Sequence, residues 1–192
     1  AELSEAARNN SERTIVRKPR RGDIRDAKGN LLATSKIVKT ISADPHVLGT
    51  NYMHVARAVA PLLEMPLEEV AEKMRPRVWL NDAGEPRPLQ YVVLKRKVEE
   101  ETWQKIKETL ANVSFGVDET VLKPKAQASL DRVRRSGVFD EPDEIRFYPN
   151  QSLAAHVLGY VGVRMRETSR GPIKDTSGKD GLELTLDNVL TG

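Results

Sequence analysis

The sequence predicts an α+β fold with strands toward the two ends of the chain and helices in its middle. Short β-prone runs separated by turn residues occupy residues 22–41 and 145–163. Apolar residues recur at helical spacing in the middle of the chain, over residues 55–74 and 102–110. A chain of 192 residues can bury one good core or two small ones, and its 39% hydrophobic and 31% charged content is that of a globular protein.

The N-terminal third predicts a spacer followed by extended segments. Residues 1–13 are polar with nothing to bury. The strongest turn signal is residues 26–29, because Asp26 can accept hydrogen bonds from the backbone ahead of it and Gly29 tolerates a positive φ. Residues 23–25 and 31–33 are therefore expected to pair as a hairpin. A third extended piece, separated by a tight turn, follows at 37–41 and ends at Asp44-Pro45.

The middle of the chain predicts helices interrupted by one strand. Val55, Val59 and Leu62 form one apolar stripe, and Pro66 opens a second helix that Pro76 closes. Four further segments follow by pattern and composition: a loop at 81–88, a strand at 91–94, a helix at 102–110 and an extended piece at 113–117.

The last third predicts mixed elements. A helix is expected over 123–138, opened near Pro124 and stopped at Gly137. The segments expected after it are an acidic loop at 140–143, a strand at 145–148, a short helix ended by Gly159, an extended piece at 160–163, a mobile loop at 164–180 and a new element at 182–190.

Composition excludes several classes. The absence of cysteine excludes thiol catalysis, disulfides and cysteine-based zinc sites. No apolar stretch approaches the roughly 18 to 20 residues that cross a bilayer, and no signal-peptide core is present. Because the sequence starts without Met and stops within a patterned segment, we interpret it as a piece of a longer protein whose flanks could carry an anchor.

Catalytic patterns are missing as well. None of the ten serines has a lysine at the third following position, and neither Ser-x-Asn nor Lys-Thr-Gly occurs. The three histidines lack the His-Glu-x-x-His spacing of a zinc site. Residues 176–180 resemble the end of a phosphate-binding loop, but Ile173 stands where glycine is required and Asp180 replaces the hydroxyl. We therefore expect no catalytic residue, metal site or cofactor.

A basic run supports an alternative function. Its members lie within thirteen residues and face a single acidic residue, Asp23; they are Arg13, Arg17, Lys18, Arg20, Arg21 and Arg25. Such a run is usually solvated surface, but it could attract anionic lipid headgroups or nucleic acid. Aromatic residues that would stack on bases are scarce at 5%, which disfavours the nucleic-acid reading.

Three separated segments resemble the N-terminal module of class B penicillin-binding proteins, called the dimerisation or pedestal domain. Residues 21–33 are similar to Arg-Gly-x-Ile-x-Asp-Arg-x-Gly-x-x-Leu-Ala, with Ala27 departing from the usual Arg, and Ser42-Ala43-Asp44-Pro45 matches a common Ala-Asp-Pro. Residues 146–149 and 154–162 are similar to Arg-x-Tyr-Pro followed by Ala-x-His-x-x-Gly-x-x-Gly. Residues 181–192 resemble Gly-x-Glu-x-x-x-Asp-x-x-Leu-x-Gly.

The motif residues that the resemblance assigns a structural role are Arg21, Gly22, Asp26, Gly29, Asp44, Pro45, Arg146, Tyr148, Pro149, Gly159, Gly162, Gly181, Glu183 and Asp187. Arg21 and Arg146 can each form a two-pronged pair with a carboxylate such as Asp26 or Glu183. We therefore expect an arginine–carboxylate cluster that joins the beginning and the end of the chain.

The resemblance implies an elongated pedestal with a strand-rich base and a helix-containing head. The base would comprise 14–45 and 145–192, the head 46–144 with an inserted helix at 123–138, and residues 1–13 a juxtamembrane spacer. This segment would have no enzymatic activity of its own. It would position a transpeptidase domain of the division or elongation type and dock the membrane glycan polymerase and other cell-wall synthesis proteins, with a homodimer left open. The resemblance places it in the periplasm or extracytoplasmic space, tethered by an N-terminal transmembrane helix outside this sequence.

Overall fold

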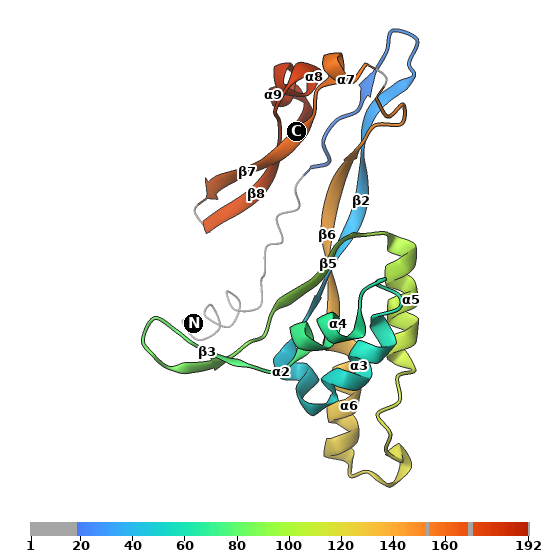
Figure 1. The fold of residues 1–192 in the computed structure, drawn as a ribbon, viewed down its shortest axis with the longest axis vertical. Helices are drawn as coiled ribbons and strands as arrows, with labels where there is room; N and C mark the ends of the chain where they lie inside the picture. Colours follow the sequence, from blue (N-terminus) through green and yellow to red (C-terminus); the bar gives the residue numbers. More distant parts are fainter. Residues whose placement is uncertain (1–18, 153, 169–170, 192) are drawn as a thin grey trace, which may run out of the picture. The chain divides into compact units, whose positions relative to one another are not determined.

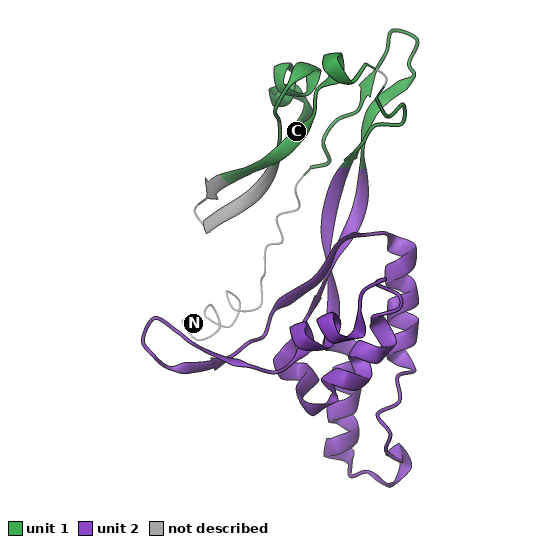
Figure 2. Ribbon diagram, viewed as in Figure 1, with its two compact units in different colours: residues 1–35, 146–192 green, residues 36–145 purple. Residues whose placement is uncertain are grey.

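A computed structural model describes residues 19–152, 154–168 and 171–191 of the chain (Figure 1). It divides into two compact units: residues 1–35 with 146–192 form unit 1, and residues 36–145 form unit 2 (Figure 2). The sequence-based boundaries lie at 45/46 and 144/145. The predicted spacer at 1–13 and the β-prone run at 14–16 lie outside the described residues.

The predicted hairpin near the N-terminus is confirmed. β1 (Ile24–Arg25) pairs antiparallel with β2 (Leu31–Ala43), with Ile24 opposite Ala33. Asp26 Oδ1 accepts hydrogen bonds from the backbone N–H groups of Lys28 and Asn30, both at 2.8 Å. The tight turn expected between 33 and 37 is wrong, because β2 continues unbroken to Ala43 and passes from unit 1 into unit 2.

Unit 1 contains a hairpin near its C-terminal end that the sequence did not predict. β7 (Val161–Thr168) and β8 (Gly171–Gly178) pair antiparallel from Val161 opposite Gly178 to Thr168 opposite Gly171. The mobile loop expected over 164–180 is therefore wrong. Polar composition indicated exposure, but a two-stranded ribbon forms its backbone ladder without burying an apolar face.

Three short helices complete unit 1: α7 (Ala155–Leu158), α8 (Gly181–Thr185) and α9 (Asp187–Leu190). Its apolar core is small and consists of Ile24, Ala33, Leu158 and Leu190. The Gly22 N–H donates to the Leu190 carbonyl at 2.8 Å. The first and last described segments of the chain are therefore joined within this unit.

Unit 2 contains the larger core, in which helices pack around the C-terminal part of β2. Its helices are α2 (Pro45–Leu48), η1 (Gly49–Asn51), α3 (Tyr52–Val59), α4 (Leu67–Met74), α5 (Glu100–Ala111), η2 (Glu119–Val121) and α6 (Pro124–Ser136). Ile41, Leu48, Leu63 and Met74 are completely buried there. The helices predicted from apolar spacing are confirmed, including the one stopped at Gly137.

Asp44 and Pro45 start helix α2. The Asp44 carboxylate accepts hydrogen bonds from the N–H groups of His46 at 2.9 Å and Val47 at 3.1 Å. Pro45 occupies the first helical turn, where its missing N–H costs nothing. The Asp-Pro pair therefore ends β2 and turns the chain into the helical part of unit 2.

Two strands flank β2 in unit 2. β5 (Val92–Val98) pairs with it antiparallel, with Ala43 opposite Val92, and β6 (Val138–Phe147) also pairs with β2. The acidic loop expected at 140–143 is wrong, because these residues belong to β6. Lys39 Nζ lies 2.6 Å from Asp140 Oδ2 and Thr40 Oγ1 donates to Asp143 Oδ2 at 3.0 Å, so partners on β2 accommodate the charges.

A small hairpin made of β3 (Val78–Leu80) and β4 (Pro86–Pro88) also belongs to unit 2. The loop predicted at 81–88 is therefore wrong at its end, where β4 begins. The segment 113–117, expected to be extended, contains no strand.

Leu63→Ala should lower the free energy of unfolding by about 2–5 kcal/mol, because it leaves a cavity at a fully buried site. Leu80→Ala, at a side chain 67% exposed, is the matched control and should change it by less than about 0.5 kcal/mol. Urea denaturation measures both. Equal effects would contradict the placement of Leu63 in the core.

Candidate functional site

The centre of the candidate site is the carboxylate of Glu183, which is completely buried in unit 1. Arg21 Nε donates to Glu183 Oε2 at 2.8 Å, and Arg146 Nε donates to Glu183 Oε1 at 2.7 Å. The Tyr148 hydroxyl approaches Oε1 at 3.4 Å. One carboxylate thus joins residues from the start of the chain, the end of β6 and helix α8.

Arg21 extends this arrangement to helix α9. Its Nη1 donates to Asp187 Oδ1 at 2.7 Å and to Thr191 Oγ1 at 3.2 Å, and its Nη2 donates to the Glu183 carbonyl at 2.8 Å. The side chain is only 3% exposed. The planar guanidinium therefore uses its fork of donors to hold the C-terminal helices from one side.

Arg146 contacts the backbone at Gly22 and the side chain of Ser35 in strand β2. Its Nη1 donates to the Gly22 carbonyl at 2.7 Å and approaches Ser35 Oγ at 3.3 Å. The side chain is 2% exposed. We call the set Arg21, Arg146, Tyr148, Glu183 and Asp187 the arginine–carboxylate cluster.

The charges of the cluster balance, with two guanidinium groups against two carboxylates. Burial by itself raises the pKa of Asp187, but the hydrogen bonds from the Gly178 N–H and from Arg21 outweigh it and lower the pKa. Burial also lowers the pKa of Arg21, and the hydrogen bonds with Glu183 and Asp187 outweigh that effect. Burial, followed by the nearby Glu183 charge, raises the pKa of Tyr148, so its hydroxyl keeps its proton at neutral pH.

Two glycines allow the backbone to close around the cluster. A Cβ atom on Gly178 would lie 2.0 Å from the Glu183 carbonyl oxygen, and one on Gly159 would lie 1.8 Å from the Asp180 carbonyl oxygen. Gly159 also has a φ of +73°, which side-chain-bearing residues rarely adopt. Any larger residue would force β8 or α7 away from helix α8.

The other motif residues lie outside the cluster. Asp26 and Gly29 form the β1–β2 turn, so Glu183 rather than Asp26 is the carboxylate that Arg21 and Arg146 share. Asp44 and Pro45 start α2 in unit 2, as described above. Glycines 22, 162 and 181 and Pro149 lie in unit 1, where Gly22 contributes backbone groups to the joined ends.

The structure adds contacts that the sequence analysis missed. Gly178 belongs to the segment that resembles a phosphate-binding loop, and its N–H donates to Asp187 Oδ1 at 2.8 Å. Ser35 and Thr191 lie beside the two arginines, at 3.3 Å from Arg146 and 3.2 Å from Arg21, although the sequence assigns them no role. A short hydroxyl side chain inside a strand or after a helix carries no signal that it faces a buried arginine.

In the basic run, the described arginines are paired with carboxylates. Arg21 is buried in the cluster, and Arg20 and Arg25 both lie 3.1 Å from carboxylate oxygens of Asp23. Arg13, Arg17 and Lys18 lie outside the described residues. The described part of the run therefore gives no support to the anionic-surface alternative.

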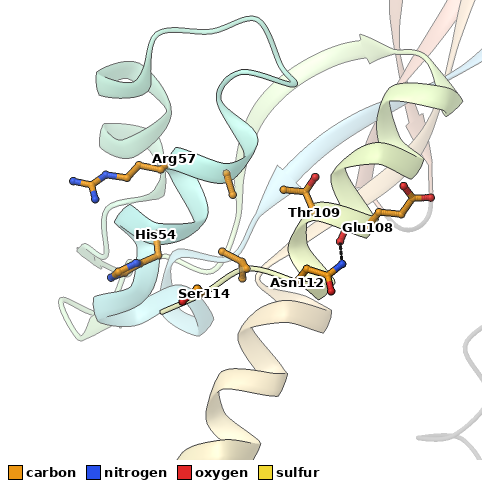
Figure 3. A pocket seen from close by; sticks show the side chains of 8 residues that line it. His54, Arg57, Glu108, Thr109, Asn112 and Ser114 are labelled. Atoms are coloured by element: carbon orange, nitrogen blue, oxygen red, sulfur yellow. Dashed lines mark hydrogen bonds between the residues drawn. The ribbon is translucent and has the colours of Figure 1, made fainter. Parts of the chain in front are cut away.

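A shallow depression of about 610 Å³ lies in unit 2 between α3 and α5, lined by residues that include His54, Arg57 and Glu108 (Figure 3). Ser114 Oγ accepts a hydrogen bond from the Gly116 N–H, and the His54 ring packs edge-on against Phe115. These contacts are those of a turn and of core packing, not of a nucleophile and its base.

Within residues 19–152, 154–168 and 171–191, no group of three or more His, Asp or Glu side chains is arranged to hold a metal ion. No helix among the described residues is long and apolar enough to span a bilayer. In the cluster, each charged side chain is engaged by a protein partner, so the arrangement can fix the positions of chain segments but offers no group for proton transfer or nucleophilic attack.

Comparison with known proteins gives the class. Residues 16–192 match the family described as the penicillin-binding protein dimerisation domain. The chain therefore belongs to this family, the pedestal module of class B penicillin-binding proteins, which is distinct from their catalytic domain.

Individual relatives agree with the family. The chain is 28% identical over 190 residues to Stage V sporulation protein D of Bacillus subtilis, covering 99% of this chain and 23% of that protein. Penicillin-binding protein 2X from Streptococcus thermophilus has a similar fold, with a TM-score of 0.59 at 18% identity over 91% of this chain and 23% of that one. A complex between PBP2 and MreC from Helicobacter pylori matches with a TM-score of 0.52 at 22% identity, covering 91% and 29%. The chain thus spans about a quarter of the length of these relatives.

Glu183→Gln should lower the free energy of unfolding of unit 1 by about 3–5 kcal/mol, because it leaves two buried guanidinium groups short of a charged partner. A double-mutant cycle of Glu183→Gln with Arg146→Lys should give a coupling energy of about 1–3 kcal/mol. Urea denaturation supplies the four values.

The exposed pair Arg20 and Asp23 is the control for this cycle and should couple by less than about 1 kcal/mol. A coupling near zero between Glu183 and Arg146 would contradict a stabilising role for the cluster. If Glu183→Gln does not fold, a cycle of Arg21→Lys with Asp187→Asn replaces it, since these two side chains lie 2.7 Å apart.

The lowered pKa of Asp187 predicts a pH dependence of stability. The contribution of a carboxylate whose pKa is lowered by folding is present above its unfolded pKa, about 3.9, and is lost as pH falls through the folded value. Asp187→Asn should therefore be less stable than wild type at neutral pH and should lose less stability below about pH 4. Asp82→Asn, on an exposed turn of unit 2, is the control, and denaturation from pH 7 to pH 2 is the measurement. Parallel wild-type and Asp187→Asn profiles would contradict the assignment.

Proposed function

We propose that this chain is the non-catalytic, extracytoplasmic pedestal of a penicillin-binding protein, which positions a transpeptidase domain and docks other cell-wall synthesis proteins. The observation that carries the proposal is the arginine–carboxylate cluster. It fixes residues 20–22 against residues 183–191 by buried ion pairs. A domain that follows the C-terminal helices would therefore be held at a defined place relative to residues 20–22.

The outer surface of the C-terminal helices supports this role. Leu184 is 52% exposed and Val189 is 80% exposed, although Glu183 and Leu190 beside them in the sequence are buried. The cluster thus holds α8 and α9 firmly from within, while apolar side chains on their outer sides remain uncovered in this chain. A folded catalytic domain that packs on this surface would bury them.

The chemistry of the longer protein belongs to another domain. The sequence lacks the Ser-x-x-Lys, Ser-x-Asn and Lys-Thr-Gly set of penicillin-reactive enzymes. Peptide cross-linking through an acyl-serine is accordingly proposed for the part of the protein outside this chain. In this scheme unit 1 is the base of the pedestal and unit 2 its head, and residues 1–13 are a spacer after a membrane anchor.

Docking of partners is supported by one of the relatives. The Helicobacter pylori structure is a complex of PBP2 with MreC, so a protein with a similar fold binds a second protein. For this chain we propose the membrane glycan polymerase and other cell-wall synthesis proteins as partners. The corresponding location is outside the cytoplasmic membrane, with the chain tethered to it.

The test uses the longer protein that carries this domain together with its catalytic domain. A Leu184→Asp, Val189→Asp variant should leave the isolated chain as stable as wild type, since both side chains are exposed. In the longer protein, a bound β-lactam should raise the Tm of the wild-type pedestal along with that of the catalytic domain. In the variant, loss of an interface worth about 1 kcal/mol should lower the pedestal Tm by about 2–4 °C. The pedestal Tm of the variant should also no longer rise when a β-lactam binds the catalytic domain.

Val121→Asp in unit 2, at a side chain 77% exposed, is the control and should leave the coupling intact. Differential scanning calorimetry measures all three proteins. Two results would overturn the proposal: unchanged coupling in the double variant, or covalent labelling of the 192-residue chain itself by a fluorescent penicillin.

A further inference from the structure

The β3–β4 hairpin of unit 2 carries an uncovered apolar face, and in Figure 1 it projects from the helices of that unit. Val78 pairs with Pro88 and Leu80 pairs with Pro86, so these four side chains share one face of the ribbon. Val78 is 65% exposed and Leu80 is 67% exposed. Trp79, on the opposite face, is 52% exposed. A two-stranded hairpin of this kind gains stability from a further strand.

The hydrogen-bond pattern shows which edge of the hairpin can accept that strand. Asn81 N donates to the Glu85 carbonyl at 3.0 Å and Leu89 N donates to the Arg77 carbonyl at 2.8 Å. Hydrogen-bonded and non-hydrogen-bonded pairs alternate in an antiparallel ladder. The backbone N–H and C=O groups of Trp79 therefore point toward Arg87 on β4, and those of Val78 and Leu80 point away from β4.

The other edge of the hairpin is blocked. Pro86 and Pro88 occupy the outward positions of β4, and proline has no N–H to donate to a neighbouring strand. In the part of the chain that the structure describes, β3 pairs with β4 alone. A third strand can therefore add only along β3.

We propose that β3 pairs antiparallel with β3 of a second copy of this chain, about a two-fold axis at Trp79, to make a four-stranded sheet across the dimer. In this register Val78 of each copy lies opposite Leu80 of the other. The N–H and C=O groups of Val78 and Leu80 point away from β4. In the dimer these groups form four hydrogen bonds between the two copies of β3. The apolar faces of the two hairpins become one continuous surface.

The side chains of the hairpin favour a second copy over an unrelated strand. The two Trp79 residues would meet at a non-hydrogen-bonded position, where cross-strand side chains lie closest and aromatic pairs are favourable. Charge is complementary as well. Asp82 lies at the tip of the hairpin and Arg75 and Arg77 at its base, so antiparallel pairing brings the acidic tip of each copy toward the two arginines of the other. Within one chain these arginines lie 3.4 and 3.8 Å from Glu72, so Asp82 of the second copy would add to an existing exposed pair.

The strands are three residues long, so the interface is smaller than those of stable dimers and the association should be weak. The inference is independent of the pedestal role, because it concerns unit 2 alone and needs no catalytic domain.

A cysteine placed at the axis tests the register. Cα atoms at a non-hydrogen-bonded pair lie about 4.5 Å apart, which is within the range that a disulfide spans. The chain has no cysteine, so Trp79→Cys introduces a single thiol. Under mild oxidation it should form a disulfide-linked dimer at least tenfold faster than Val117→Cys, whose side chain in unit 2 is 51% exposed. Equal rates would overturn the proposal.

A second measurement tests the edge itself without a thiol. Val78→Pro removes an outward N–H of β3 and leaves the β3–β4 bonds intact, whereas Val78→Thr keeps the N–H. Sedimentation velocity at concentrations up to several hundred micromolar should show dimers for wild type and Val78→Thr, and at least a tenfold weaker association for Val78→Pro. Circular dichroism should show the same fold for all three. A wild-type chain that stays monomeric, or that dimerises equally well with Val78→Pro, would contradict pairing through β3, as would capture of an extended segment of a different protein at this edge in place of a second copy.

Discussion

The burial of Glu183 between Arg21 and Arg146 is the interaction on which unit 1 depends. A carboxylate taken out of water costs several kcal/mol unless charged partners and hydrogen bonds replace the water. Here the partners come from positions 162 and 37 residues away in the sequence. None of the three segments can leave without stranding a buried charge in the others, so the segment around Arg21, the end of β6 and the C-terminal helices are held together.

The two units are stabilised in different ways. Unit 2 has a large core of aliphatic side chains from β2, β5 and its helices, with Trp103 and Phe115 as its buried aromatics among the described residues. Among the described residues, the core of unit 1 contains four buried apolar side chains. Its structure relies instead on polar groups with directional requirements, which tolerate fewer alternative packings than an apolar core does. Glycines at 159 and 178 are the backbone counterpart of this requirement, because the chain must approach itself closely where the charges meet.

Charge in this domain is therefore used for placement. Arginine, glutamate, aspartate and tyrosine lie together in unit 1, as they do in many active sites, but each has a protein partner. The two surfaces proposed here for other molecules are of different kinds: the exposed apolar side chains of α8 and α9, and the backbone N–H and C=O groups along the edge of β3. The cluster fixes the backbone of α8 and α9, and the hairpin that carries β3 belongs to unit 2.

Local chemistry in the sequence determined the turn at 26–29, the helix start at Asp44-Pro45 and the helices with an apolar stripe, because each depends on residues within a few positions of one another. The motif resemblance supplied Arg21, Arg146 and Glu183 as candidates, but spacing alone left Asp26 and Glu183 as equal partners, and only the fold brings Glu183 to both arginines. The same limit explains residues 140–143 of β6, most of the β7–β8 hairpin and strand β4, which were expected to lie in loops. A strand is defined by the partner that completes its ladder, and a polar or proline-containing segment gives no local sign that such a partner exists.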